Sequence, residues 1–412
     1  MEFSDKESRK LKSVEREEIV RIEKFAGEGP SLAYDSTGKV LFVRYVLPGE
    51  LVKVKIYKEA SDYAMADPLE IIEKSPLRKD PTCEYFSMCG GCDYQMLNYD
   101  NQLEIKKKLV EQTFQRIGNI TFPLSGILKS PKDFEYRNNM TYKVNPRREL
   151  IGFFRKDSKS IVDIKKCALE MPIISKALNS MKIQHLENLE EYPFPKHNFK
   201  VRATTTDEIG VYWVPTKDYE DKAVYETIAA ANQSIKFKIS KDSFFQVNPY
   251  LVPFWIEKIV DFLDQEKSEK IVDLYCGIGL ITLFVSFHAK ETIGVEIAKS
   301  SVLDANHNKE INNITSNVEF MLGDAGECLK QIGSADVIIV DPPRAGMDDA
   351  TRELLLEYAP KKIIYSSCKV STMARDIGIL SEKYELKELY LVDMFPQTHH
   401  VELLSLLVRK EN

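Results

Sequence analysis

The chain of 412 residues lacks the features of membrane-spanning and exported proteins. It has no run of about 18 apolar residues, so we expect no transmembrane helix. The segment Met1–Arg16 is charged, which predicts a solvated, flexible tail rather than an export signal. Seven cysteines without such a signal indicate thiols or metal ligands rather than disulfides. We therefore expect a cytoplasmic protein that makes no contact with a membrane.

The chain is also short of positive charge, with a formal net charge of −6, and it contains no internal repeat or low-complexity segment. The charge is uneven, because Lys129–Lys166 holds 11 Lys and Arg against 5 Asp and Glu, which leaves +6 there and −12 elsewhere. The basic segment can bind a phosphate backbone, or it can be an ordinary solvated loop region. The length, with 43% hydrophobic and 29% charged residues, predicts two or three globular domains.

Residues 17–75 have the pattern of a small all-β unit. Strands are indicated at Val40–Val46 and Val52–Lys58, on either side of the turn Pro48-Gly49. The second strand alternates strictly, with Val52, Val54 and Ile56 on one face and Lys53, Lys55 and Tyr57 on the other. Lysine beside an aromatic ring is typical of small barrels that bind single-stranded nucleic acid. An ordinary half-exposed strand would show the same pattern.

Four cysteines have the spacing of a metal site. Cys83, Cys89 and Cys92 are separated by five and two residues, and Gly90-Gly91 allows the backbone to fold tightly between them. A fourth, Cys167, follows much later in the chain. Four thiolates can hold zinc or an iron–sulfur cluster, and spacing alone does not choose between the two.

From Phe237 onward the pattern alternates between strand and helix, which predicts an α/β sheet. One strand, Lys270–Tyr275, enters the glycine turn Cys276–Gly279, and a second, Thr292–Glu296, ends in an acid. Glycines at such a turn let a ligand approach the backbone, and the terminal acid can bind a ribose diol. The turn lacks a third glycine and a basic residue for pyrophosphate. This favours a mononucleoside ligand, with S-adenosylmethionine as the first candidate.

Two further strands of this sheet end in reactive side chains. The strand Asp336–Val340 stops at Asp341, because the two prolines that follow cannot continue a ladder. The strand Lys362–Ser367 runs directly into Cys368. In an open α/β sheet, ligands bind beyond the carboxyl ends of the strands, so a carboxylate and a thiol are predicted on the same edge. The alternative is that Cys368 is only a small core residue.

With these residues considered together, the chain resembles the RNA uracil-5-methyltransferase family over nearly its whole length. Within that family it is most similar to the iron–sulfur branch that methylates ribosomal RNA. The matching motifs are the four cysteines, Phe244–Asn248, Asp273–Gly277, Glu296, Asp341–Arg344, Ser367-Cys368 with Ala374–Asp376, and Asp393–Pro396 followed by Glu402. The resemblance implies a Rossmann-like class I methyltransferase domain, an N-terminal OB-like TRAM β-barrel and a central iron–sulfur domain.

The resemblance and the composition together predict domain boundaries and a monomer. A flexible tail covers residues 1–16, and the RNA-binding TRAM-like barrel covers 17–75. The central iron–sulfur and RNA-binding domain takes 76–97 and 120–236. The catalytic domain takes 98–119 and 237–412, so the helix expected at Asn98–Gly118 should pack on it.

The resemblance also implies roles for individual residues. Cys368 is the nucleophile that adds to carbon 6 of uracil, and Glu402 is the base that removes the proton from carbon 5. S-adenosylmethionine is expected to bind Gln246, Tyr275, Gly277, Gly279, Glu296, Asp324 and Asp341. The ligands of a [4Fe–4S] cluster are Cys83, Cys89, Cys92 and Cys167. The substrate is a flipped or single-stranded uridine of RNA, expected in 23S rRNA, whose contacts are predicted at Lys53, Lys55, Arg137, Lys143, Arg147, Arg155 and Arg344.

The chain departs from the family pattern at three positions. Lys369-Val370 stands where Asn-Pro usually follows the nucleophile. Leu280 stands where some members have asparagine, and His399 stands at a position that is often glycine. Two other functions remain compatible with the sequence. One is an amino-methyltransferase that acts on an exocyclic nitrogen and needs no thiolate. The other is a non-catalytic RNA-binding protein that retains the fold.

Overall fold

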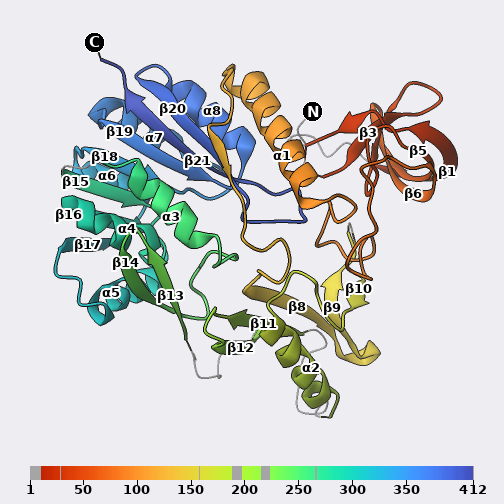
Figure 1. Ribbon diagram of the computed structural model, residues 1–412, viewed down its shortest axis with the longest axis horizontal. Helices are drawn as coiled ribbons and strands as arrows, with labels where there is room; N and C mark the ends of the chain where they lie inside the picture. Colours follow the sequence, from red (N-terminus) through yellow and green to blue (C-terminus); the bar gives the residue numbers. More distant parts are fainter. Residues whose placement is uncertain are drawn as a thin grey trace. The chain divides into compact units, whose positions relative to one another are not determined.

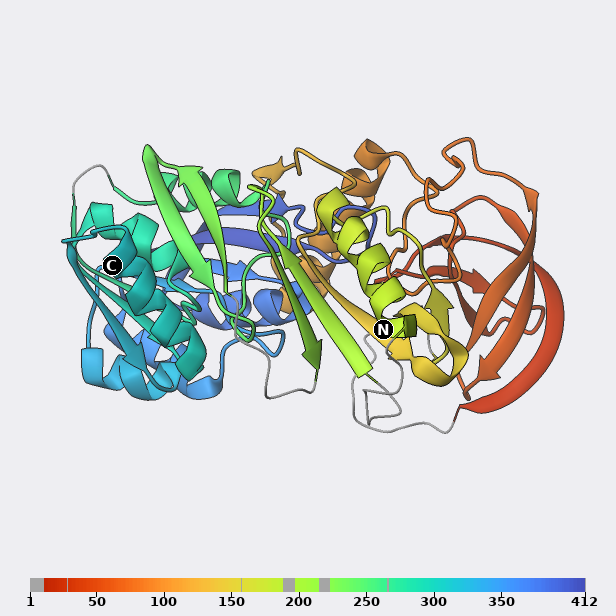
Figure 2. The same cartoon turned by 90° about the horizontal axis from the view of Figure 1, so that it is seen from below.

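The computed structural model describes residues 11–27, 29–156, 158–187, 197–214, 223–264 and 267–411 (Figures 1 and 2). The chain divides into two compact units, each discontinuous in sequence. The first runs to Leu109 and includes Phe153–Val162 and Pro396–His400, and the second contains the remainder. No helix among the described residues is both long and apolar enough to cross a bilayer.

The first unit contains a six-stranded sheet in the order β1-β5-β6-β4-β3-β2. Its strands are β1 (Lys12–Arg21), β2 (Lys24–Phe25), β3 (Ser31–Tyr34), β4 (Val40–Val43), β5 (Leu51–Glu59) and β6 (Tyr63–Glu73). Neighbours are antiparallel except β4 and β6. Val52, Val54 and Ile56 of β5 are fully buried in the core of this sheet, while the residues between them stay partly exposed. The alternation predicted for this strand is therefore confirmed.

Strand β1 corrects the predicted tail. It begins at Lys12 and pairs with β5 from Lys12↔Glu59 to Arg21↔Leu51, so the tail predicted over residues 1–16 is too long. Residues 1–10 lie outside the described part of the chain. The strand is difficult to recognise in the sequence because Val20 is its only fully buried residue and its other side chains are mostly charged. Its backbone pairing with β5, rather than an apolar face, places it in the sheet.

The second unit is built on an eight-stranded sheet in the order β17-β16-β15-β18-β19-β21-β20-β7, flanked by helices (Figure 1). The strands are β7 (Gly126–Leu128), β15 (Ser268–Leu274), β16 (Ala289–Glu296), β17 (Asn317–Leu322), β18 (Val337–Val340), β19 (Lys362–Ser367), β20 (Tyr384–Val392) and β21 (Glu402–Arg409). β15 to β19 are parallel, and β21 runs antiparallel between β19 and β20. All four residues of β18 are buried, as a parallel strand covered on both faces requires.

The helices of this unit follow the expected strand–helix alternation. They are α3 (Val252–Asp261), α4 (Leu280–Val285), α5 (Lys299–Ile311), α6 (Ala325–Ile332), α7 (Asp349–Tyr358) and α8 (Val370–Leu380), with a 3₁₀ turn at Ser286–His288. The Rossmann-like arrangement predicted from Phe237 onward is confirmed, because each glycine or acid turn lies between a parallel strand and the helix that follows it.

Smaller elements complete the chain. One sheet has the order β10-β9-β8-β11-β12, and a hairpin pairs β13 with β14. Their bounds are β8 (Asn139–Asn145), β9 (Leu150–Phe154), β10 (Ile161–Asp163), β11 (His197–Ala203), β12 (Ile209–Val214), β13 (Val224–Ala230) and β14 (Gln233–Ile239). A 3₁₀ turn covers Pro146–Arg148, and α2 covers Pro172–Glu187.

The long helix predicted before Gly118 is present as α1 (Tyr99–Thr113) followed by a π-helical turn, Phe114–Gly118. The part of α1 up to Leu109 belongs to the first unit, which departs from the prediction for the whole helix, whereas the π turn lies in the second unit and packs on α8. The backbone of α8 lies close to Gly118: a Cβ atom added to Gly118 would be 2.6 Å from the carbonyl oxygen of Ala374. Only glycine fits there, so this residue fixes how the turn meets the helix behind Cys368.

Candidate active site

The sheet of the second unit brings Cys368 and Glu402 to one edge. Cys368 follows the last residue of β19, and Glu402 is the first residue of β21. The two strands are antiparallel neighbours, with Ser366 opposite Leu404 and Ser367 opposite Leu403. The next step in that register brings Cys368 opposite Glu402, although the two are far apart in sequence. Asp341 follows the last residue of β18, on the other side of β19, so three reactive groups share the edge.

The pKa values of Glu402 and Asp341 are both raised. Burial raises the pKa of Glu402 well above its ordinary value, and the charge of Asp341 raises it further, while Ser366 and Arg344 oppose the shift. Burial likewise raises the pKa of Asp341 to about 6, against a hydrogen bond from Ser366. The Ser366 hydroxyl donates to Glu402 Oε1 at 3.1 Å. Glu402 is 4% exposed, so its carboxyl group has little access to solvent.

The Cys368 thiol is partly exposed and surrounded by charge. Burial raises its pKa, and the nearby carboxylates of Glu402 and Asp341 add to this shift. Arg344 opposes it through its charge and a hydrogen bond to the thiol. Arg344 was predicted to contact RNA, and its guanidinium lies beside the Cys368 thiol. Arg344 is therefore the group that favours the thiolate form of Cys368.

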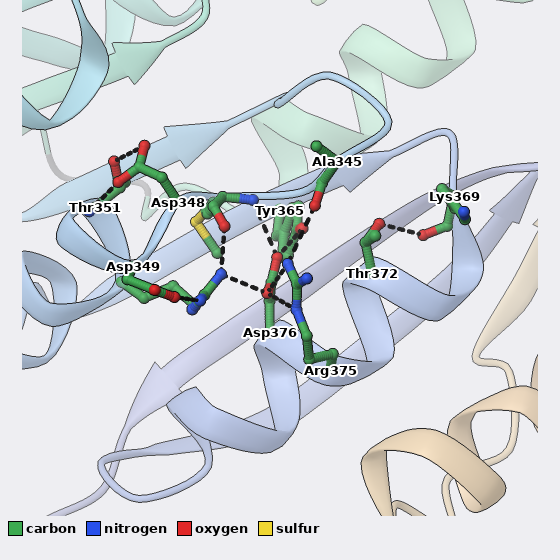
Figure 3. Close-up of polar contacts among 11 residues, drawn as sticks. Ala345, Asp348, Asp349, Thr351, Tyr365, Lys369, Thr372, Arg375 and Asp376 are labelled. Carbon is green, nitrogen blue, oxygen red and sulfur yellow. Dashed lines mark hydrogen bonds and ion pairs between the residues drawn. The ribbon is translucent and has the colours of Figure 1, made fainter. Parts of the chain in front are cut away.

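A buried carboxylate, Asp376 of α8, holds the loop that carries Asp341 and Arg344 (Figure 3). It accepts hydrogen bonds from Met347 N (3.1 Å), Arg352 Nη1 (3.0 Å) and Tyr365 Oη (2.8 Å). Arg375 Nε donates to the same carboxylate at 2.8 Å. Breaking such a buried, fully bonded charge network is costly, so Asp376 ties β19, α8 and the loop into one rigid frame.

The loop also depends on a glycine at its closest approach to Asp376. Gly346 has a φ of +80°, and a Cβ atom added to it would lie 2.7 Å from Asp376 Oδ2. A side chain here would be strained twice, by the backbone and by the contact. Sequence reasoning missed Ser366, and it named Asp376 only as part of a matching motif without giving it a role. The available signals were an acid on the apolar face of α8 and a serine two residues before Cys368, on the same face of β19.

The predicted cofactor residues surround the turn between β15 and α4. Tyr275, Gly277 and Gly279 all have positive φ angles, and an added Cβ on Gly277 would meet no atom within 4 Å. Glu296, at the end of β16, accepts hydrogen bonds from Gly277 N at 3.0 Å and Ala298 N at 2.7 Å. Because each carboxylate oxygen has two lone pairs, Glu296 can still accept from a ribose diol. The open backbone and the acid suit a nucleoside.

Two other predicted cofactor residues have contacts of their own, and so does Asp273, which the sequence named only as part of a matching motif. Asp324 caps α6, accepting from Gly326 N at 3.0 Å and Glu327 N at 3.2 Å. Gln246 is buried, and its main-chain oxygen accepts from Asn138 Nδ2 at 3.1 Å. Asp273 of β15 is fully buried and accepts from Thr282 Oγ1 at 2.5 Å. Burial raises the pKa of Asp273 to about 7, which places a third proton-holding carboxyl near Asp341.

Three of the predicted cluster cysteines lie together in the first unit. Gln95 connects two of them: its Oε1 accepts from Cys83 N at 3.0 Å and its Nε2 donates to Cys92 Sγ at 3.2 Å. Burial raises the pKa of Cys89, and the charge of Cys83 adds to this. Cys167 belongs to the second unit, where its N–H donates to Glu170 Oε1 at 3.1 Å.

The cluster itself stays a prediction. No group of three or more His, Cys, Asp and Glu side chains is gathered closely enough to hold a metal in the described ranges. The soft thiol donors suit iron or zinc.

His399 belongs to the first unit and is paired with Asp93, the residue that follows Cys92. The distance from His399 Nδ1 to Asp93 Oδ2 is 2.6 Å, and Lys156 Nζ lies 3.1 Å from Asp93 Oδ1. Burial acts to raise the pKa of Asp93, but His399 and Lys156 lower it overall. The histidine at this departure from the family pattern is thus engaged with a carboxylate.

The predicted RNA contacts fall into two groups. On β5, Lys53 Nζ lies 2.7 Å from Glu17 Oε2, and Lys55 is ion-paired with Glu15. These lysines therefore face acids of β1 rather than open solvent alone. Arg147 and Arg155 are exposed, whereas Lys143 and Arg137 are partly buried.

Comparison with known proteins places the chain among RNA-modifying enzymes. The tRNA (uracil-5-)-methyltransferase family matches residues 216–410, and the TRAM domain matches residues 12–69. An uncharacterized RNA methyltransferase of Aquifex aeolicus is 34% identical over 91% of this chain and 94% of its own length. Another, from Halalkalibacterium halodurans, is 32% identical over 95% of this chain and 96% of its own.

One solved structure is similar over nearly the whole chain. It is the tRNA (uracil-54, C5)-methyltransferase of Pyrococcus abyssi in complex with S-adenosyl-L-homocysteine. The TM-score is 0.73 and the sequence identity 25%, covering 95% of this chain and 100% of that chain.

Proposed function

The chain belongs to the tRNA (uracil-5-)-methyltransferase family, and from this membership we propose that it methylates carbon 5 of an RNA uridine through a covalent adduct of Cys368. The observation that carries the proposal is the convergence of Cys368, Glu402 and Asp341 on one edge of the sheet. Neither a nitrogen methyltransferase nor a passive RNA-binding protein requires a thiol between an arginine and two proton-holding acids.

The chemistry requires a nucleophile because carbon 5 of uracil is itself a poor one. The Cys368 thiolate, favoured by Arg344, adds to carbon 6 and forms a carbon–sulfur bond, and the electron density moves to carbon 5. S-adenosylmethionine supplies an electrophilic methyl group when bound. The turn with Gly277 and Gly279 and the acid Glu296 would hold its nucleoside. Tyr275, Gln246, Asp324 and Asp341 are proposed as further contacts.

Glu402 completes the reaction as the base. Once carbon 5 carries both the methyl group and its original hydrogen, Glu402 takes that hydrogen as a proton. The electron pair of the carbon–hydrogen bond re-forms the double bond between carbons 5 and 6, and the carbon–sulfur bond breaks. The uridine must leave the base stack to reach a thiol at the edge of a sheet, so a flipped or single-stranded site is required.

The test is incubation with RNA that carries 5-fluorouridine, in the presence of S-adenosylmethionine. Fluorine at carbon 5 cannot leave as a cation, so the adduct should be trapped and should map to Cys368 by mass spectrometry. The matched control is Cys328→Ala, which removes a buried thiol of α6 outside this edge. Methylation without any adduct would favour the amino-methyltransferase alternative.

For the substrate we propose 23S rRNA, on the strength of the four cysteines typical of the rRNA-methylating branch. A tRNA substrate is the second candidate, because the similar Pyrococcus abyssi enzyme acts on tRNA. Unmodified transcripts of both RNAs with labelled methyl donor would separate them. Incorporation into tRNA alone would end the rRNA assignment.

We also propose a [4Fe–4S] cluster on Cys83, Cys89, Cys92 and Cys167. Its support is the thiol donor set and the Gln95 contacts that hold Cys83 and Cys92. Anaerobic protein should be brown and contain about four irons per chain. Colourless protein with one zinc would identify a structural zinc site instead. The monomeric state and the four-part domain division are likewise proposals.

A further inference from the structure

Ser366 lies between the two acids of the active site. It is 1% exposed, it belongs to β19, and its side chain shares a face of that strand with Cys368. Its hydroxyl donates to Glu402 Oε1 at 3.1 Å. The next step in the register of β18 and β19 places Asp341 beside Ser366, and hydrogen bonding to the serine hydroxyl lowers the pKa of Asp341. The two acids come from different strands, β21 and the end of β18, so the serine is the group that joins them.

The number of protons in this group is limited. A hydroxyl has one proton to donate and can accept with its lone pairs. If Ser366 donates to Glu402, its second hydrogen bond requires a protonated Asp341 that donates to the serine oxygen. If Asp341 is charged, the direction of both bonds reverses and Glu402 carries the proton. In either arrangement the two acids together hold one proton and one negative charge, which is the state that buried, mutually repelling carboxyls prefer.

As the base, Glu402 needs a route by which the proton that it takes up can reach solvent. It must lose the proton that it takes from carbon 5 before the next turnover, yet it is only 4% exposed. Asp341 retains partial exposure. The other charged or titratable groups that face the pair are Arg344 and Cys368, together with Asp273 behind Asp341. Ser366 acts on the pKa of both acids through its hydroxyl, and a hydroxyl can donate its own proton while its oxygen accepts another.

We propose that Ser366 is a positioning residue that passes the reaction proton from Glu402 to Asp341, and that the proton reaches solvent from Asp341. This inference rests on the proposed uracil methylation. Of the two arrangements of the shared proton, the reactive one has Asp341 protonated and Glu402 charged, because a base must be free to accept. Glu402 takes the carbon 5 proton, and Asp341 releases its own proton to solvent. Glu402 then donates its proton to Ser366 Oγ, while the serine hydroxyl proton moves to Asp341. The starting state is restored, and one proton has been released per methyl transferred.

The experiment compares Ser366→Thr with Ser366→Val, which have the same shape and differ in the hydroxyl. Both should form the 5-fluorouridine adduct at the wild-type rate, because addition and methyl transfer precede removal of the carbon 5 proton. On ordinary RNA, Ser366→Thr should keep turnover within a few-fold of wild type. Ser366→Val should be slower by about 10–100-fold, less than the ~10²–10⁴-fold expected for loss of a base, and should accumulate methylated adduct.

A matched control is Ser405→Val, which alters a buried serine of β21 that bonds only to main chain, at Tyr365 O. It should not accumulate adduct. Equal turnover of the Thr and Val variants would overturn the relay. So would loss of the adduct in Ser366→Val alone, because the hydroxyl would then act before proton removal. If Ser366→Val does not fold, as judged by circular dichroism, Ser366→Ala is measured in its place with the same expected outcome. Absence of any adduct in the wild type would instead refute the proposed function.

Discussion

Two thiol environments in this chain differ in what surrounds the sulfur. Burial raises the pKa of both Cys368 and Cys89. Around Cys368 the other strong influences are groups that carry or exchange protons: Arg344, Asp341 and Glu402. Around Cys89 they are a second thiol, Cys83, and a backbone N–H, with a single lysine. The comparison teaches that a cysteine is suited to catalysis by acid–base neighbours, and to holding a metal by other soft donors.

The largest expected effects come from substituting one cysteine at each site: Cys368 at the proposed catalytic site and Cys92 at the proposed metal site. Cys368→Ala should abolish methylation and the 5-fluorouridine adduct, because it removes the thiol that lies beside Glu402 and Asp341. Cys92→Ser should lose bound iron and still form the adduct. Denaturing gels and iron analysis measure both. An adduct that persists in Cys368→Ala, or disappears in folded Cys92→Ser, would break the distinction between the two sites.

The next effect concerns the base beside Cys368. Glu402→Gln should slow turnover by roughly 10²–10⁴-fold, the usual contribution of a positioned acid–base group. The thiol would still add and the methyl group would still move, so a methyl-labelled protein–RNA species should accumulate on a denaturing gel. As a control, Glu385→Gln changes an exposed acid of β20 and should behave as wild type. Near-normal turnover of Glu402→Gln would assign the base to another residue.

A smaller effect is expected on pH dependence. The charge of Arg344 lowers the pKa of Cys368, so Arg344→Met should raise it. Adduct formation needs the thiolate, and its rate therefore rises with pH up to the thiol pKa. The midpoint of this rise should move to higher pH in Arg344→Met. Lys369→Met, which removes the neighbouring charge in sequence, should leave the midpoint in place. An unchanged midpoint in Arg344→Met would remove Arg344 from this role.

The smallest effect should distinguish two kinds of basic residue. Arg147 is exposed, and if it contacts phosphate, Arg147→Ala should lower the slope of log affinity against log salt by about one. Lys55 is ion-paired with Glu15, so Lys55→Ala should change the slope less. Filter binding over a range of salt concentrations measures both. Equal slopes for the two variants would show that ion pairing does not decide which residues bind RNA.

The sequence predicted the parallel strands, the glycine turn and the residues at the strand ends well. These features have strong local signals: apolar runs such as Val337–Val340, prolines that stop a strand, and glycines with positive φ. Nothing in the sequence near Glu402 or Cys368 indicated that the two residues lie close together in space. Their proximity depends on β21 entering the sheet antiparallel between β19 and β20, and only the family resemblance suggested that the two residues act together.

The misses share one physical cause, which is pairing between distant polar residues. Glu15 was assigned to the tail and Glu17 only to the start of the barrel, so their contacts with Lys55 and Lys53 were not foreseen. Asp376 is a charged residue on the apolar face of a helix, and its four donors come from a loop, from two helices and from a strand. Ser366 has no distinguishing feature in sequence, because its importance comes from the two acids on either side of it.

The register between β19 and β21 also determines which changes in chain length the enzyme can tolerate. Added residues at the turn near Ser381–Lys383, between α8 and β20, would leave the pairing of Ser367 with Leu403 intact. A single residue deleted between Leu403 and Leu407 would shift the start of β21 by one position. The carboxylate of Glu402 would then turn to the opposite face of the sheet, since neighbouring side chains of a strand point in opposite directions. Related chains of different length should therefore vary at such turns, while the spacing inside β21 stays constant.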